Sequence, residues 1–80
     1  MDFNNVHIHM IIFSKYAEKK FDILNKHKIY FTKEQIEEVL KLPEKIKRKG
    51  KYISHEKDNI KVISIKKVNT NKVLTFYPIK

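Results

Sequence analysis

The chain has 80 residues, 41% of them hydrophobic, a formal net charge of +9 and no cysteine. This length predicts one domain over residues 1–80, near the lower limit for a single self-supporting core. The lack of cysteine excludes disulfides, thiolate metal sites and cysteine nucleophiles, and the apolar run at 10–13 is too short for a signal sequence or a membrane span. We therefore expect a cytoplasmic protein with no membrane partner.

The first half of the chain predicts one strand and two helices. Residues 6–13 alternate and then become continuously apolar, which indicates a strand. Ser14 is a suitable N-cap for a helix over residues 15–26, and a capping box at Thr32 begins a second helix that Pro43 ends. The apolar helix positions expected in the core are Ala17, Phe21, Leu24, Ile36, Val39 and Leu40.

After Gly50, the rest of the chain predicts strands over residues 51–56, 60–68 and 72–77, separated by polar turns. Connections this short make consecutive strands antiparallel neighbours. The predicted fold class is therefore α+β, with the order β-α-α-β-β-β, an antiparallel sheet and two helices packed on one face.

Alternation along the last two strands separates the two faces of the predicted sheet. The side chains expected under the helices are Ile63, Ile65, Leu74 and Phe76. The side chains expected on the opposite, open face are Ser64, Lys66, Thr75 and Tyr77. A register shift of one residue would exchange the two sets.

Basic residues concentrate at the predicted joint between the second helix and the strands. Residues 41–51 contain six basic side chains and one acidic side chain, a net charge of +5. Dispersed lysine is ordinary in a chain where 17 of the 18 basic residues are lysine, but clustering at a structural joint is typical of a polyanion-binding edge. The predicted nucleic-acid-binding residues are Lys45, Lys47, Arg48, Lys49 and Lys51.

Four short segments follow a recurrent layout: Ser-Lys-Tyr-Ala at 14–17, Ile-Glu-Glu-Val-Leu-Lys-Leu-Pro-Glu at 36–44, Gly-Lys-Tyr at 50–52 and Leu-Thr-Phe-Tyr-Pro at 74–78. Over about residues 12–78, the chain resembles a small, largely uncharacterised prokaryotic domain family related to the RelE, ParE and BrnT toxins of toxin–antitoxin systems.

The resemblance implies the same β-α-α-β-β-β order. In relatives it implies metal-independent cleavage of messenger RNA or binding to gyrase, and an antitoxin that covers the active face. The chain departs from the family layout at Tyr16, where the motif has histidine, at Lys20, where it has arginine, and by an inserted stretch over residues 25–30. These departures add weight to a non-catalytic binding role as the alternative to catalysis.

A metal-independent ribonuclease must take a proton from a 2′-hydroxyl, donate one to the leaving oxygen and stabilise charge on phosphorus. His55 is the candidate acid or base, and Arg48, the only guanidinium, is the candidate phosphate ligand. Lys66 and Tyr77 complete the candidate catalytic set, with Tyr77 able to orient phosphate or to stack on a base. The ordinary alternatives are an exposed arginine and lysine, a strand histidine and a packed tyrosine at the sheet rim.

Other chemistries find little or no support in the sequence. His7 and His9 share a face of the first strand, but no third ligand has compatible spacing, so we predict no metal site and no cofactor. The chain contains no glycine-rich phosphate loop, no paired-carboxylate motif and no serine nucleophile motif.

Three functions therefore compete. The first is a RelE-like, metal-independent endoribonuclease acting on RNA. The second is a non-catalytic module of the same fold that binds nucleic acid or an antitoxin. The third is a protein-directed role in which a sheet edge or the open face docks an antitoxin-like segment or a second copy. The sequence does not decide whether the protein is catalytically active, whether it binds RNA or DNA, which nucleotide sequence it prefers or what its oligomeric state is.

Overall fold

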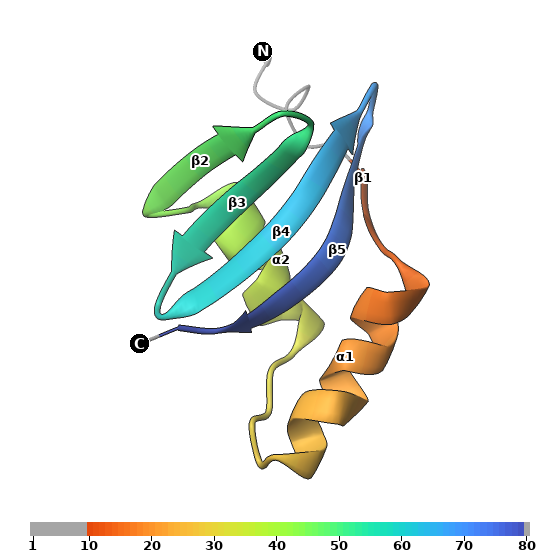
Figure 1. Cartoon of the computed structure of the whole chain (residues 1–80), viewed down its shortest axis with the longest axis vertical. Coiled ribbons are helices and arrows are strands. Elements are labelled where there is room, and N and C mark those ends of the chain that lie inside the picture. Colours follow the sequence, from red (N-terminus) through yellow and green to blue (C-terminus); the bar gives the residue numbers. More distant parts are fainter. Residues whose placement is uncertain (1–9, 80) are drawn as a thin grey trace.

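A computed structural model describes residues 10–79 and shows two helices packed against one face of a five-stranded sheet (Figure 1). The sheet order is β1-β5-β4-β3-β2, so the first and last strands of the chain are neighbours. The elements in chain order are β1 (Met10–Phe13), α1 (Lys15–Lys26), α2 (Lys33–Lys41), β2 (Lys45–Lys49), β3 (Tyr52–Lys57), β4 (Ile60–Lys67) and β5 (Thr70–Pro78).

Both predicted helix starts are confirmed by their caps. The Ser14 hydroxyl accepts a hydrogen bond from the backbone N–H of Ala17 at 3.0 Å, at the N-terminus of α1. At the N-terminus of α2, the Thr32 hydroxyl accepts from the N–H of Gln35 at 3.1 Å, and the Gln35 side chain accepts from the N–H of Thr32 at 2.8 Å. This capping box satisfies two backbone donors that the helix itself leaves unpaired.

The α+β class and the placement of both helices on one face are confirmed, but the predicted sheet needs two corrections. The basic segment is more than a joint between the second helix and the strands, because residues 45–49 form an additional strand, β2, which pairs antiparallel with β3. The sheet is also mixed, because β1 runs parallel to β5. Residues 6–9 of the predicted first strand lie outside the described residues.

Tight turns set the register of the strands. Gly50 has a φ of +61°, a left-handed conformation that glycine adopts without steric cost, and it turns the chain from β2 into β3. Asp58 and Asn59, with φ of +52° and +65°, form the two-residue turn between β3 and β4. Positive φ at both turn residues matches the right-handed twist of a hairpin, and the turn pairs Lys57 with Ile60.

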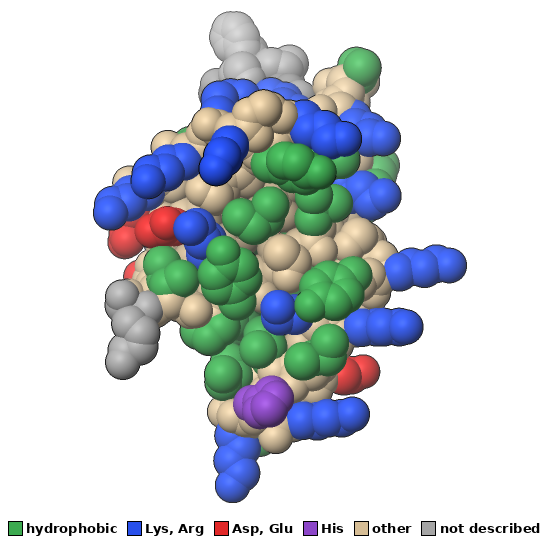
Figure 2. All heavy atoms as spheres, in the orientation of Figure 1, with side chains coloured by type: hydrophobic (Ala, Val, Ile, Leu, Met, Phe, Trp, Pro, Cys, Tyr) green, Lys and Arg blue, Asp and Glu red, His purple; other side chains and the backbone are tan. Residues whose placement is uncertain are grey.

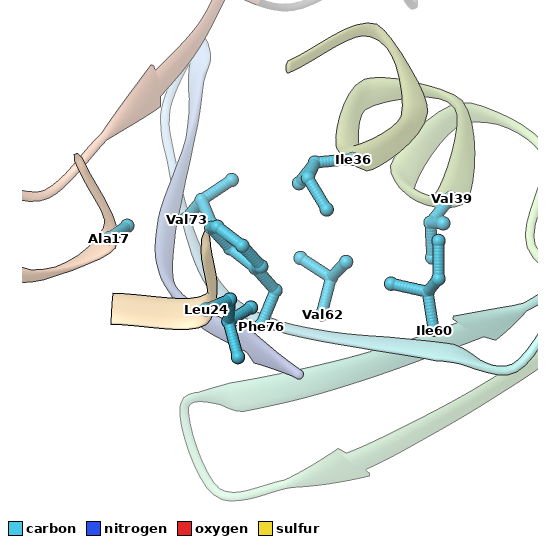
Figure 3. Packing of buried hydrophobic residues seen from close by; sticks show 8 residues of the cluster. All are labelled: Ala17, Leu24, Ile36, Val39, Ile60, Val62, Val73 and Phe76. Atoms are coloured by element: carbon cyan, nitrogen blue, oxygen red, sulfur yellow. The ribbon is translucent and has the colours of Figure 1, made fainter. Parts of the chain in front are cut away.

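The core lies between the helices and the inner face of the sheet (Figure 3). The helices contribute Ala17 and Leu24 from α1 and Ile36 and Val39 from α2, and the sheet contributes Ile60 and Val62 from β4 and Val73 and Phe76 from β5. Fully burying an aliphatic or aromatic side chain of this size stabilises a fold by about 1.5–3 kcal/mol. These contacts hold β3, β4 and β5 in place and leave their other face without a helix.

The predicted faces of β4 are wrong by one residue. Val62 and Ser64 are fully buried on the helix-bearing face, whereas Ile63 and Ile65 are half-buried on the open face. Lys66 follows Ser64 by two positions and therefore lies on the helix-bearing side, where it is exposed near the end of the strand. The sequence could not determine which alternate residues of β4 face the helices, because both sets contain apolar side chains.

A β-bulge keeps most of the β5 prediction intact. Ile63 pairs with Thr75 but Ser64 pairs with Val73, so Leu74 is an extra residue in β5. Phe76 is therefore buried as predicted, and Thr75 and Tyr77 lie on the open face as predicted. Val73 enters the core, and Leu74 is only half-buried.

Candidate nucleic-acid interface

Strand β2 gathers four of the five predicted nucleic-acid-binding residues on one exposed edge. All five positions of β2 are exposed, and four of them are basic. The fifth predicted residue, Lys51, lies in the following turn with its ammonium 5.6 Å from the centre of the Tyr52 ring. Lysine on an edge strand also opposes edge-to-edge pairing with a second copy, because like charges would face each other.

The alternation of β2 divides these cations between the two faces of the sheet. Lys45, Lys47 and Lys49 pair with Glu56, Ser54 and Tyr52 of β3. These pairs belong to the open face, together with Ile63 and Ile65 of β4. Arg48 pairs with Ile53, which is buried on the helix-bearing face, so the Arg48 side chain leaves the strand on that side.

A hollow of about 360 Å³ lies where β2 meets the open face. It is lined by Lys47, Arg48, Lys49, Tyr52, Ser54, Lys61 and Ile63. Its cationic side chains on the open face are those of Lys47, Lys49 and Lys61, and no acidic residue lines it, whereas Arg48 borders it from β2 with its side chain on the helix-bearing face. Among the described residues, only Lys61 of this set forms a salt bridge, at 3.6 Å to Glu56.

The open face combines these cations with apolar and aromatic surface. Figure 2 shows hydrophobic side chains gathered at the centre of this face, with lysine and arginine side chains around them. Tyr52 is 47% exposed, and Ile63 and Ile65 are half-buried beside it. Such a surface offers phosphate ligands at its rim and flat contact area for bases at its centre.

A second cationic group, which was not predicted from the sequence, lies at the seam between α1 and β5. The Lys20 ammonium donates a hydrogen bond to the Thr75 hydroxyl at 3.4 Å. It also lies 5.5 Å from the ring centre of Tyr16 and 5.6 Å from that of Tyr77. The spacing of four between Tyr16 and Lys20 places them on one helix face, a signal that was present in the sequence.

His55 is oriented by a partly buried hydrogen bond to the sheet. Its Nε2 lies 3.1 Å from the hydroxyl of Ser64, which is fully buried, and its Nδ1 is buried with no hydrogen-bond partner among the described residues. Burial, and to a lesser extent the Arg48 guanidinium, lower the pKa of His55 below its ordinary value of 6.5. The ring is therefore neutral near pH 7, but neither nitrogen is presented to a reacting group.

The structure does not bring the predicted catalytic set to one place. Arg48, His55 and Lys66 lie on the helix-bearing side of the sheet, whereas Tyr77 pairs with Lys61 on the open face. Arg48 and His55 are near enough for the guanidinium to lower the pKa of the imidazole. The residues that do converge are those of the hollow, which adds Tyr52, Ser54 and Lys61 to the predicted cations.

The described residues contain neither a metal-binding cluster nor a helix that could span a membrane. Between residues 10 and 79, no group of three or more histidine, cysteine, aspartate or glutamate side chains is arranged to hold a metal ion. His7 and His9 lie outside the described residues. No helix in the described part of the chain has both the length and the apolar character needed to cross a membrane.

Comparisons with known proteins give no further guide to this interface. No protein family, curated protein sequence or solved structure matches the chain. The functional argument therefore rests on the side chains themselves.

Proposed function

We propose that this protein binds single-stranded nucleic acid through β2 and the open face of its sheet, with RNA as the first candidate and DNA as the alternative. The observation that supports the proposal is the hollow at Lys47, Lys49 and Lys61, whose lining has three cationic side chains on the open face and no acidic residue. A phosphodiester backbone is the polyanion that such a groove fits, and the exposed ring of Tyr52 provides a surface on which an unpaired base can stack.

Single strands suit this surface better than a duplex. The open face is a sheet with half-buried Ile63 and Ile65 at its centre, and these side chains gain contact only with a base that is free of its pairing partner. A duplex would present phosphates to β2 but would keep its bases stacked inside. We therefore expect single strands to bind more tightly than duplexes of the same length.

The test is fluorescence anisotropy with labelled single-stranded RNA, single-stranded DNA and duplex, at several salt concentrations. We expect saturable binding that weakens steeply with salt, because binding releases counterions from phosphates. The proposal fails if the single strands do not bind at low salt or if their affinity does not depend on salt. Preference for RNA or DNA follows from the same titrations.

Endoribonuclease activity is the second candidate, and the closeness of Arg48 to His55 is the observation that favours it. Against it, the Nε2 atom of His55 is engaged by Ser64, and Tyr77 lies across the sheet. Incubation of single-stranded RNA with the purified protein in a chelator decides the point. Cleavage by the wild type that is lost in Arg48→Ala and His55→Ala would establish catalysis, whereas intact RNA would leave the binding role alone.

A RelE-like fold, an antitoxin partner and a cytoplasmic location are proposals of the same kind. They are supported by the order of one strand, two helices and a β-meander, by the four segments that carry the resemblance, and by the absence of cysteine. Growth arrest of bacterial cells on induction of the chain, relieved by neutral substitutions at Lys47 and Lys49, would support a toxin role. Unaffected growth would argue against it.

A further inference from the structure

One cross-strand row of the open face leads from the hollow to the seam at α1. Lys47 pairs with Ser54, Ser54 with Ile63, and Ile63 with Thr75. The Thr75 hydroxyl then accepts the hydrogen bond from Lys20. A straight line across four strands therefore begins at one lysine and ends at another.

The far end of this row has the same kinds of groups as the hollow. Lys20 provides an ammonium, and the ring centres of Tyr16 and Tyr77 lie 5.5 Å and 5.6 Å from it. Tyr16 is 53% exposed, so its ring is open to a further stacking partner. Within the described residues no carboxylate pairs with Lys20, and Glu18 of the same helix is bonded to Lys33.

The row also fixes how much nucleic acid it would accommodate. The three inter-strand steps from β2 to β5 span about 14 Å, at about 4.8 Å per step. A fully stacked strand advances about 3.4 Å per nucleotide, and a strand whose bases turn onto the sheet advances further, so about five nucleotides at most cover this distance. A strand of that length would place phosphates near both lysines and bases over the tyrosines and isoleucines between them.

We infer that a bound single strand crosses the sheet along this row, with Lys20 as a second phosphate anchor and Tyr16 and Tyr77 as stacking surfaces at its far end. The inference rests on the proposed function and adds to it the path of the strand and a site size of about five nucleotides. The alternative is that Lys20 only attaches α1 to the edge of β5. In that case its removal would change the stability of the fold but not the length dependence of binding.

The experiment is a length series of oligonucleotides, from dinucleotide to decamer, titrated against four proteins by anisotropy at low salt. The proteins are the wild type, Lys20→Gln, Tyr16→Leu and the matched control Lys19→Gln, which removes the same charge from an exposed neighbouring position of α1. RNA and DNA series are run in parallel. Thermal melts establish that each variant is folded.

For the wild type, we expect affinity to rise steeply up to about five nucleotides and only slowly beyond. Lys20→Gln should bind the shortest oligomers like the wild type, gain little from greater length and lower the salt slope for the decamer by about 0.7. Tyr16→Leu should weaken decamer binding by at least about fivefold, the lower end of base stacking on an aromatic side chain. Lys19→Gln should match the wild type.

The possible failures are distinct. If no oligomer of either type binds to the wild type, the proposed function itself is wrong. If the wild type binds but Lys20→Gln shows the same length dependence and salt slope, the hollow binds nucleic acid without the seam and only this inference is overturned. An equal loss in Lys19→Gln would also overturn it, because overall charge would then explain the effect.

Discussion

Neutralising two lysines of β2 tests the proposed interface most directly. In Lys47→Gln/Lys49→Gln, both open-face cations of the hollow that have no salt bridge to a described acid are removed, and Lys61, which is bridged to Glu56, stays. Both side chains are exposed, and glutamine keeps most of their length, so the fold should be unaffected. The measured quantity is the slope of log affinity against log salt for a labelled single strand.

The expected slopes follow from the number of phosphates that each protein neutralises. For single strands the slope is about −0.7 per neutralised phosphate, so these two cations contribute about −1.4 to the slope of the wild type. The double variant should lose this contribution of about −1.4. A fourfold increase in salt should therefore weaken binding by the wild type about sevenfold more than binding by the variant.

The matched control is Lys41→Gln, which removes a charge from the end of α2, beside Glu34, Glu37 and Glu38 and away from the hollow. Its slope should equal that of the wild type. If the double variant keeps the slope of the wild type, the hollow does not contact the phosphate backbone. If Lys41→Gln lowers the slope as much per charge removed, binding follows net charge and not this site.

Three further predictions concern the fold. Burial lowers the pKa of His55 in the folded state, so near and below pH 6.5 the unfolded chain binds more protons than the folded protein. The free energy of unfolding should therefore fall as the pH drops from about 7.5 to about 5.5. Urea melts at these two pH values should show a smaller loss in His55→Gln than in the wild type. An equal loss in both proteins would contradict this assignment. Phe76→Ala, at a fully buried core position, should cost about 3–5 kcal/mol of unfolding free energy; a loss below about 1 kcal/mol would refute the packing. Thr32→Ala should cost about 1 kcal/mol through loss of the cap, and an unchanged melting temperature would show that the capping box contributes nothing.

The sequence determined those features that depend on a few neighbouring residues. Ser14 and Thr32 start the helices because their side chains satisfy backbone donors within one turn. The Asp58–Asn59 turn follows from two residues that tolerate positive φ. The cluster of cations after Pro43 was also visible, because charge needs no tertiary information to be counted.

Tertiary structure decided which residues share a surface. Strand β4 has apolar residues on both faces, so either face could have been buried under the helices. The face with Val62 and Ser64 is the buried one, and Ser64 can be buried because its hydroxyl has a hydrogen-bond partner in His55. Strand β2 contains one apolar residue and four cations, a composition that does not itself predict a strand. It forms a strand by pairing with the backbone of β3. The approach of Lys20 to Thr75, 55 positions apart in the chain, depends on α1 packing beside β5. Such contacts arise from the packing of whole elements, which a local pattern does not encode.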